Sequence, residues 1–153
     1  MKTLYILRHA EASHDAPIDK SRPLTDKGRH QAFVQGQQMK QNGWLPDYIL
    51  CSPALRTEET LEALALEARP TIFHPALYNA AAGTLYERLK MVPDACESVL
   101  LVAHNPGVSD LLRFLGDAQR DFSPATLAVV TCACAQWKAL LPGRNHLTQI
   151  LYA

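Results

Sequence analysis

The sequence lacks both a long hydrophobic run and an excess of charge of either sign. No stretch approaches the roughly 18 uninterrupted apolar residues of a membrane-spanning helix, and the apolar start, Met1–Leu7, is too short for a signal peptide. The 15 basic and 15 acidic side chains cancel, so no global field attracts nucleic acid or acidic lipid. We therefore expect a cytoplasmic protein that binds neither nucleic acid nor membranes, and any anion site must come from local placement of charge.

Cysteine is also scarce, and its spacing forms no metal or disulfide framework. The four cysteines are Cys51, Cys96, Cys132 and Cys134, with no C-x-x-C pair among them. We interpret them as small buried apolar residues in a reducing compartment. Cys132 and Cys134 would point to the same face of a strand, which leaves a metal or redox pair as the alternative to simple packing.

The length of 153 residues predicts one domain, residues 1–153. A chain of this size buries roughly two thirds of its unfolded surface on folding, so neither a disulfide nor a metal is needed for stability. Hydrophobic residues make up 48% and charged residues 20%, which is typical of a globular protein.

Short apolar runs alternate with longer amphipathic segments along the chain. The runs are Thr3–Leu7, Asp47–Cys51 and Ser98–Ala103. This alternation predicts an α/β fold whose central strands are buried on both faces. Three further strands are expected near the C-terminus, at Thr126–Thr131, Gln136–Leu141 and Leu147–Leu151. They would extend the sheet in the antiparallel sense and make it mixed.

Turn and capping residues predict where the helices begin and end. One helix is expected from Thr25 to Gly43, and a weaker one from Thr84 to Met91, after a strand near Thr71–His74. Two others follow strand ends in the same way, one after Ser52-Pro53 and one after Asn105-Pro106. In both we expect the polar residue, Ser52 or Asn105, to cap the helix N-terminus.

Several polar residues fall where strands lead into helices. Arg8 and His9 end the first strand, Arg56 lies in the first turn after the second, and His104 ends the strand that begins at Ser98. In an open α/β sheet the ligand crevice lies beyond the carboxyl ends of the strands, and helix N-termini there favour anions. The sequence therefore predicts a phosphate site, with the long Ala10–Pro23 loop as its rim.

These residue types suit phosphoryl transfer, in which negative charge spreads over three equatorial oxygens. The guanidinium forks of Arg8 and Arg56 match pairs of such oxygens, and a protonated His104 could hold the third. His9 would then attack phosphorus through a neutral ring nitrogen. The neighbouring arginines favour that neutral form because they disfavour its protonation.

Four blocks of the sequence together resemble a known family. They are Leu7-Arg8-His9-Ala10-Glu11, Arg22-Pro23-Leu24-Thr25, the run from Ser52 to Thr60, and Val102-Ala103-His104-Asn105-Pro106. In this order they resemble the histidine phosphatase, or phosphoglycerate mutase-like, superfamily, and within it the small phosphohistidine phosphatases of the SixA type. The resemblance covers the chain from residue 3 to about residue 116.

The resemblance implies a three-layer α/β/α sandwich with a mainly parallel mixed sheet. It implies a covalent phosphohistidine at His9, a pocket that includes Arg8, Arg56 and His104, and hydrolysis by water without metal or cofactor. It also suggests that Arg22 reaches the phosphate. The expected partner is a protein phosphorylated on histidine or a small phosphorylated substrate.

The sequence departs from the family pattern in two places. Ala10 stands where the family often has glycine, which is tolerated if the backbone there avoids positive φ. The segment from Pro75 to Thr84 contains no carboxylate, whereas larger members place an acid there to protonate the leaving oxygen. Because an imidazole can leave without such an acid, the absence favours phosphohistidine as substrate. Other candidates for the general acid are Glu11, Asp15 and Glu87.

Two rival functions stay open at this point. One is a phosphatase of the same chemistry that acts on small phosphate esters; mutase activity is the least expected, because few residues remain to build a sugar-acid pocket. The other is a non-catalytic module that binds phosphorylated ligands.

The remaining histidines are interpreted as surface or packing residues. They are His14, His30, His74 and His146. A zinc site made of His9, His14 and His104 is not expected, because the adjacent arginines would repel a divalent cation.

Overall fold

The computed structural model describes residues 1–116 and 119–153. The helices and strands, in chain order, are β1 (Lys2–Arg8), η1 (Asp19–Ser21), α1 (Asp26–Gln41), β2 (Tyr48–Cys51), α2 (Leu55–Leu64), β3 (Thr71–Phe73), η2 (Pro75–Leu77), α3 (Ala82–Leu89), β4 (Ser98–Ala103), α4 (Gly107–Leu115), β5 (Leu127–Cys132), η3 (Trp137–Ala139) and β6 (His146–Leu151). No helix within these ranges is long and apolar enough to cross a bilayer.

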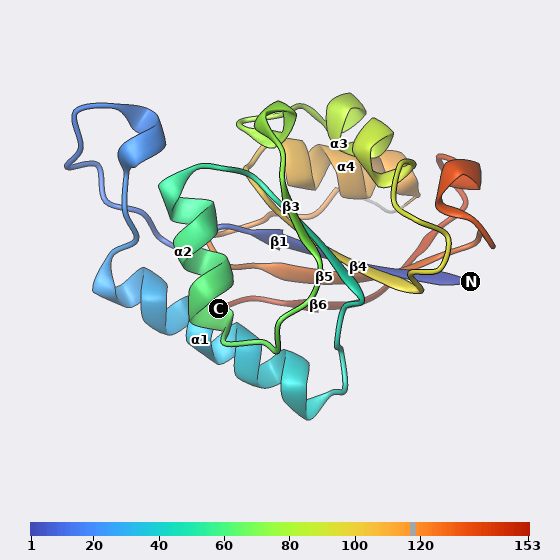
Figure 1. Cartoon of the computed structure of the whole chain (residues 1–153), viewed down its shortest axis with the longest axis horizontal. Helices are drawn as coiled ribbons and strands as arrows, with labels where there is room; N and C mark the ends of the chain where they lie inside the picture. The colour runs from blue at the N-terminus through green and yellow to red at the C-terminus, as the bar shows by residue number, and fades with distance from the viewer. Residues whose placement is uncertain (117–118) are drawn as a thin grey trace.

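Six strands of the described chain form one mixed sheet between two layers of helices. The strand order is β3-β2-β4-β1-β5-β6, with β3, β2, β4 and β1 parallel and β5 and β6 antiparallel to their neighbours. Figure 1 shows α1 and α2 on one face of the sheet and α3 and α4 on the other. The predicted three-layer α/β/α architecture is confirmed, while the single domain over residues 1–153 stays a prediction.

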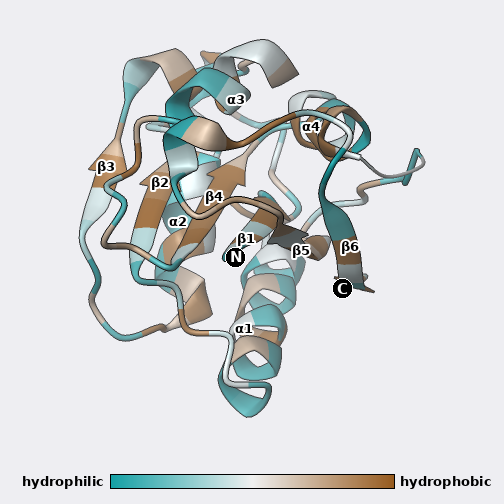
Figure 2. Ribbon diagram, turned by 90° about the vertical axis from the view of Figure 1, so that its right-hand side faces the viewer, coloured by the Kyte–Doolittle hydropathy of each residue, from teal (hydrophilic) through white to brown (hydrophobic). Residues whose placement is uncertain are grey.

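The core lies on both faces of the sheet because the central strands are apolar throughout. All six residues of β4 are buried, and Figure 2 shows hydrophobic residues along β2 and β4. One buried cluster packs α3 and α4 on the sheet, and a second packs Met39 of α1 and Leu64 of α2 on the opposite face. Strands buried on both faces are what continuous apolar runs predict.

The first helix follows its sequence signals closely. The Thr25 side chain accepts a hydrogen bond from the Gly28 N–H, and Gly43 lies two residues beyond the helix with a φ of 68°. The N-cap threonine and the glycine in the left-handed region after the last turn explain why the helix lies within the predicted limits, Thr25 and Gly43.

The other two predicted caps are wrong. The helix after Ser52-Pro53 begins at Leu55 with Ala54 as N-cap, and the helix after Asn105-Pro106 begins at Gly107 with Pro106 as N-cap. Neither has a side-chain cap. The Ser52 hydroxyl instead hydrogen-bonds His104, a partner 52 residues away in the chain that local sequence does not reveal.

The C-terminal region also differs from the prediction in one element. Gln136–Leu141 is not a strand but contains the short 3₁₀ helix η3. Trp137 in it is fully buried and its indole N–H donates to the Cys96 carbonyl, so tertiary contacts hold this segment out of the sheet. Strand β5 ends at Cys132, and Cys134 lies beyond it; both cysteines have free thiols and lie in the core.

Close packing of α1 against the end of α2 makes a testable prediction. A Cβ on Gly36 would lie 2.0 Å from the Leu64 carbonyl oxygen, so we expect Gly36→Ala to reduce the free energy of unfolding by about 1–3 kcal/mol. Gly83, in α3, has no atom within 4 Å of such a Cβ. The control Gly83→Ala should stabilise by about 0.5–1 kcal/mol. Urea denaturation measures both, and equal effects of the two substitutions would contradict the packing.

Candidate active site

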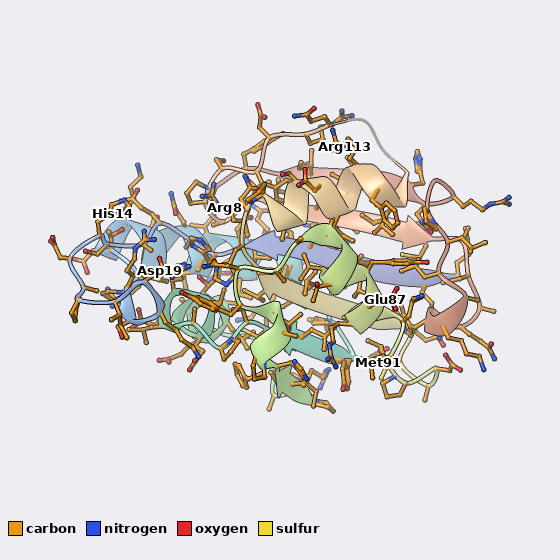
Figure 3. All side chains as sticks on the ribbon, turned by 90° about the horizontal axis from the view of Figure 1, so that it is seen from above. Arg8, His14, Asp19, Glu87, Met91 and Arg113 are labelled. Carbon is orange, nitrogen blue, oxygen red and sulfur yellow. The ribbon has the colours of Figure 1, made fainter. Side chains whose placement is uncertain are left out.

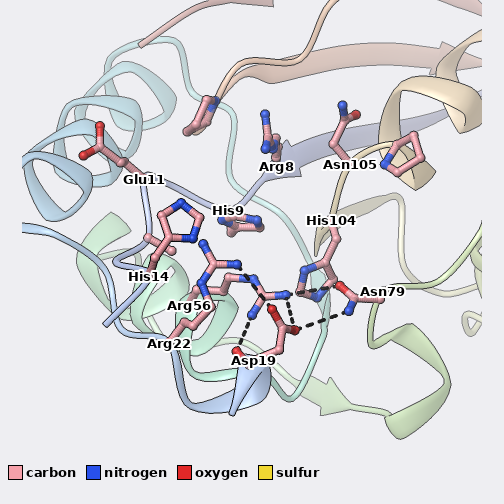
Figure 4. A pocket seen from close by; sticks show the side chains of 13 residues that line it. Arg8, His9, Glu11, His14, Asp19, Arg22, Arg56, Asn79, His104 and Asn105 are labelled. Atoms are coloured by element: carbon pink, nitrogen blue, oxygen red, sulfur yellow. Dashed lines mark hydrogen bonds and ion pairs between the residues drawn. The ribbon is translucent and has the colours of Figure 1, made fainter. Parts of the chain in front are cut away.

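A pocket of about 560 Å³ lies at the carboxyl ends of β1, β2 and β4. Its lining includes all four residues of the predicted catalytic set and Arg22, and the full lining is Arg8, His9, Glu11, Ala12, His14, Asp19, Arg22, Arg56, Asn79, His104, Asn105, Pro106 and Pro124. Figure 4 shows these side chains converging on one space. The Ala10–Pro23 loop contributes several of them, as expected of a pocket rim.

The parallel pairing of β1 and β4 brings the two histidines together. Arg8 and Ala103 are register partners at the strand ends, so His9 and His104 follow side by side. Their ring centroids are 5.4 Å apart, and both side chains are nearly buried, at 8% and 3% exposure.

The His9 ring is held as a neutral imidazole with its outer nitrogen free. Nδ1 lies 2.8 Å from the Ala10 carbonyl oxygen, which only accepts, so Nδ1 carries the proton and Nε2 keeps its lone pair. Burial lowers the pKa of His9 to about 4, and Arg56, Arg8 and Arg22 add to the effect. The predicted influence of the arginines is present, but desolvation is the larger cause.

His104 is neutral as well in the free protein, so the expected protonated form is not present before an anion binds. Burial first, and then Arg56 and His9, lower its pKa to about 3. Its Nε2 lies 2.7 Å from Ser52 Oγ. The buried Ser52 hydroxyl has no other hydrogen-bond partner among the described residues, so it satisfies its proton by donating to Nε2. The His104 proton then sits on Nδ1, where a neutral ring still donates a hydrogen bond.

Arg8 and Arg56 are each anchored by one edge of the guanidinium group. Arg8 Nη1 donates to the Phe122 carbonyl at 2.7 Å. Arg56 is 3% exposed, and its terminal nitrogens donate to the Asp19 carbonyl, the Asp19 carboxylate and the Asn79 side chain. The Nε atom of each arginine has no partner.

Three buried side-chain atoms of the described residues lack a hydrogen-bond partner. They are Arg8 Nε, Arg56 Nε and His104 Nδ1, and all three belong to residues that line this one pocket. A buried unpaired donor is costly, and native structures rarely keep one without a reason. Three donors without an acceptor form an arrangement that can bind the oxygens of a tetrahedral anion.

Asp19 was missed by the sequence analysis. Its carboxylate accepts hydrogen bonds from Arg22, Arg56, Tyr78 and Asn79, several of which are marked in Figure 4. The hydrogen bond from Tyr78 is the largest cause that lowers the Asp19 pKa, and Arg56 and Arg22 lower it further. Tyr78 and Asn79 belong to the Pro75–Thr84 segment, which contains no carboxylate. The sequence feature that could have pointed to Asp19 as a pocket residue is its place in the rim loop, three residues before Arg22.

Of the general-acid candidates and Arg22, only some lie at the pocket. Glu11 lines the pocket, whereas Asp15 and Glu87 do not. Glu87 of α3 pairs with Lys90, the residue after that helix, and Figure 3 shows Glu87 far along the molecule from Arg8 and Asp19. Arg22 lines the pocket, with Nε donating to the Ser13 carbonyl.

Two smaller expectations are also settled. His14 is exposed, as its interpretation as a surface residue predicts, and its position on the surface is at the pocket lining. Ala10 has no positive φ and its N–H donates to Thr60 Oγ1, so the methyl group fits as expected.

Metal-ligand clusters are absent from the described part of the chain. No group of three or more His, Cys, Asp or Glu side chains there is arranged to hold a metal ion.

Comparison with known proteins agrees with this geometry. Residues 4–95 match the model of the histidine phosphatase superfamily, branch 1. An uncharacterised protein of Mycobacterium tuberculosis is 35% identical over 69% of this chain, and the match spans 66% of that relative's length. A SixA phosphohistidine phosphatase homologue of Haemophilus influenzae is 35% identical over 82% of this chain and 85% of the relative.

Solved structures of SixA proteins share the whole fold. One, described as a phosphohistidine phosphatase SixA from Nakamurella multipartitia, superposes with a TM-score of 0.91 at 27% identity. The match covers 99% of this chain and 95% of that one. Another, a protein histidine phosphatase SixA complexed with tungstate, has a TM-score of 0.85 at 26% identity and covers 97% of this chain and 96% of that one. The chain thus belongs to the histidine phosphatase superfamily, and its family and its SixA-like fold are those of a phosphatase enzyme.

Proposed function

We propose that this protein removes a phosphoryl group from phosphohistidine through a covalent intermediate on His9. The observation that carries the proposal is the set of three unpartnered buried donors, Arg8 Nε, Arg56 Nε and His104 Nδ1, beside a histidine whose Nε2 is unprotonated. Donors that lack an acceptor in the free protein gain one when a phosphate binds. A bare ring nitrogen beside them is the nucleophile that phosphoryl transfer requires.

The first step exchanges one P–N bond for another. The lone pair of His9 Nε2 forms a bond to phosphorus while the bond to the substrate nitrogen breaks, and its electron pair returns to the departing ring. Arg8, Arg56 and His104 stabilise the charge on the three equatorial oxygens. The Ala10 carbonyl, which accepts from Nδ1, stabilises the positive charge that develops on the His9 ring.

The second step transfers the phosphoryl group to water. Oxygen of a water molecule attacks phosphorus, the bond to Nε2 breaks, and His9 recovers its lone pair. One proton of the attacking water passes to bulk solvent, and inorganic phosphate leaves with the other. No metal ion takes part in the proposed route.

The choice of phosphohistidine as substrate rests on the leaving group. An alkoxide is a poor leaving group without a proton donor, and the segment from Pro75 to Thr84 supplies no carboxylic acid. An imidazole whose other nitrogen is protonated departs as a neutral ring. The SixA-type names of the similar proteins support the same interpretation. The tungstate in one of their complexes, a phosphate-like anion, supports a phosphate site.

Two alternatives are separated by direct assay. A phosphatase for small esters would turn over sugar phosphates at least as well as a peptide phosphorylated on histidine. A non-catalytic binding module would bind phosphorylated ligands and never release phosphate from them.

Covalent trapping tests the proposed nucleophile. We expect ³²P-labelled phosphohistidine protein to label the wild-type chain on His9, with a bond that is labile to acid and stable to alkali. His9→Asn should lose the label and reduce turnover by at least about 1,000-fold. The matched control is His30→Gln, on the exposed side of α1, which should keep both. Label on another residue would contradict the assignment.

The depressed histidine pKa values predict a pH dependence with a definite sign. Folded His9 and His104 should titrate near 4 and 3 rather than near the ordinary 6.5, as observed by NMR of their ring carbons in the phosphate-free protein. The folded state then binds fewer protons than the unfolded state between about pH 4 and 6.5. The free energy of unfolding should therefore fall as the pH falls through this window.

The His9→Asn variant checks this dependence of stability on pH. His9→Asn should make the free energy of unfolding less steep in pH between about 4 and 6.5. Titration of both rings near 6.5 in the wild-type protein would contradict the buried neutral pair.

Anion affinity tests the donors directly. Inorganic phosphate should bind the wild-type protein, as measured by calorimetry, and Arg56→Gln should weaken binding by at least about tenfold because a charge-assisted donor is lost. Arg113→Gln, on the exposed surface of α4, is the matched control and should bind as wild type. Equal affinities of the two variants would argue against this phosphate site.

A further inference from the structure

The exposure of the side chains differs between the floor and the rim of the pocket, with the phosphate donors at the floor and Asp19 at the rim. His9, Arg56 and His104 are 8%, 3% and 3% exposed, whereas the Asp19 side chain is 46% exposed. In an in-line transfer the leaving group lies opposite the nucleophile. Because His9 attacks from the floor, the leaving group points toward the rim.

The two oxygens of Asp19 are used unequally. Oδ2 accepts from Arg56 at 3.0 Å, from Asn79 at 3.4 Å and from Tyr78. Oδ1 accepts only from Arg22, at 3.3 Å, among the described residues. A carboxylate oxygen has two lone pairs, so Oδ1 keeps one acceptor position open at the rim of the pocket.

Glu11 is the other carboxylate in the pocket lining, and it is engaged elsewhere. It accepts from the Thr25 hydroxyl at 3.2 Å and pairs with Lys27 at 3.6 Å. Both partners belong to the start of α1, so Glu11 is held toward that helix.

We propose that Asp19 Oδ1 accepts a hydrogen bond from the protonated outer nitrogen of the substrate's phosphohistidine ring and so selects phosphohistidine over phosphate esters. This role rests on the proposed function. The four donors around Asp19 keep its carboxylate ionised, so it cannot protonate an alkoxide, and its charge repels one. The same charge stabilises a ring N–H that carries positive charge.

The protonation state explains how the contact assists the reaction. The phosphorylated ring, with a proton on its outer nitrogen, is cationic; when the P–N bond breaks, the electron pair returns to the ring and a neutral imidazole departs with that proton. Asp19 raises the fraction of bound substrate in this reactive form. Its effect should be greatest above the substrate ring's own pKa and should disappear in acid.

The other charged or titratable groups around Asp19 do not supply the same acceptor. They are Lys20 and Arg22 on its own segment, Arg56 on α2, Tyr78 after η2, and His9, His14, Glu11 and His104 in the pocket. The cations among them only disfavour a cationic ring, and the Tyr78 hydroxyl already donates to Asp19. Asp19 therefore accounts for the expected pH dependence.

The test compares two substrates over a range of pH. A histidine-phosphorylated peptide needs the ring proton, whereas p-nitrophenyl phosphate has a leaving group that needs none. We expect Asp19→Asn to lower kcat/KM for the peptide about tenfold more than for the ester. The alkaline limb of the peptide profile should also move to lower pH, and that of the ester should not.

Tyr78→Phe is the control for an effect that comes only from the positioning of Asp19. It keeps the carboxylate and removes one of its donors, so it should change both substrates by the same factor. Asp19→Glu retains the charge and should restore part of the peptide's alkaline limb. Equal losses on both substrates in Asp19→Asn, with an unchanged pH profile, would mean that Asp19 only positions Arg56 and would overturn the proposal.

Assays of the wild-type protein distinguish a wrong role for Asp19 from a wrong proposed function. If it turns over the peptide and labels His9 while Asp19→Asn leaves the substrate ratio unchanged, only the role of Asp19 is lost. If it labels His9 from the ester and never hydrolyses the peptide, the substrate class is wrong and the role of Asp19 falls with it.

Discussion

The parallel pairing of β1 with β4 is the constraint on which the pocket depends. The pair runs in register from Thr3 opposite Ser98 to Arg8 opposite Ala103, and the His9 N–H continues it by donating to the Ala103 carbonyl at 3.1 Å. A shift of one residue would turn every side chain of the shifted strand to the opposite face. The strands are buried on both faces, so packing holds this register, and the two rings meet 5.4 Å apart as a consequence.

Burial gives the pocket its chemical character. Positive charge is concentrated on Arg8, Arg22 and Arg56, and the two histidines between them stay neutral because desolvation opposes a further charge. Neutrality leaves His9 with a lone pair and His104 with a donor N–H. Asp19 balances part of the positive charge at the rim while the Nε edges of Arg8 and Arg56 remain unpaired. A doubly charged anion fits this imbalance better than a neutral ligand does.

Much of the fold was predictable because its signals are local. The apolar runs gave the positions of β1, β2 and β4, and Thr25 and Gly43 marked the limits of α1. The errors came where a distant partner overrode a local preference. Ser52 is a residue type that commonly caps helices, but its hydroxyl hydrogen-bonds His104. The segment around Trp137 is apolar enough for a strand, but the hydrogen bond from Trp137 to the Cys96 carbonyl anchors it outside the sheet.

The sequence alone determined the layer architecture and the group of residues at the strand ends, because period and turn chemistry are properties of neighbouring residues. It pointed to Arg8, His9, Arg56 and His104 as one set since parallel strands end at the same edge of a sheet. Only the tertiary structure decided the protonation of both imidazoles, the free Nε edges of Arg8 and Arg56 and the place of Asp19. Those features depend on burial and on contacts between residues 37 to 114 positions apart in the chain, which no local pattern encodes.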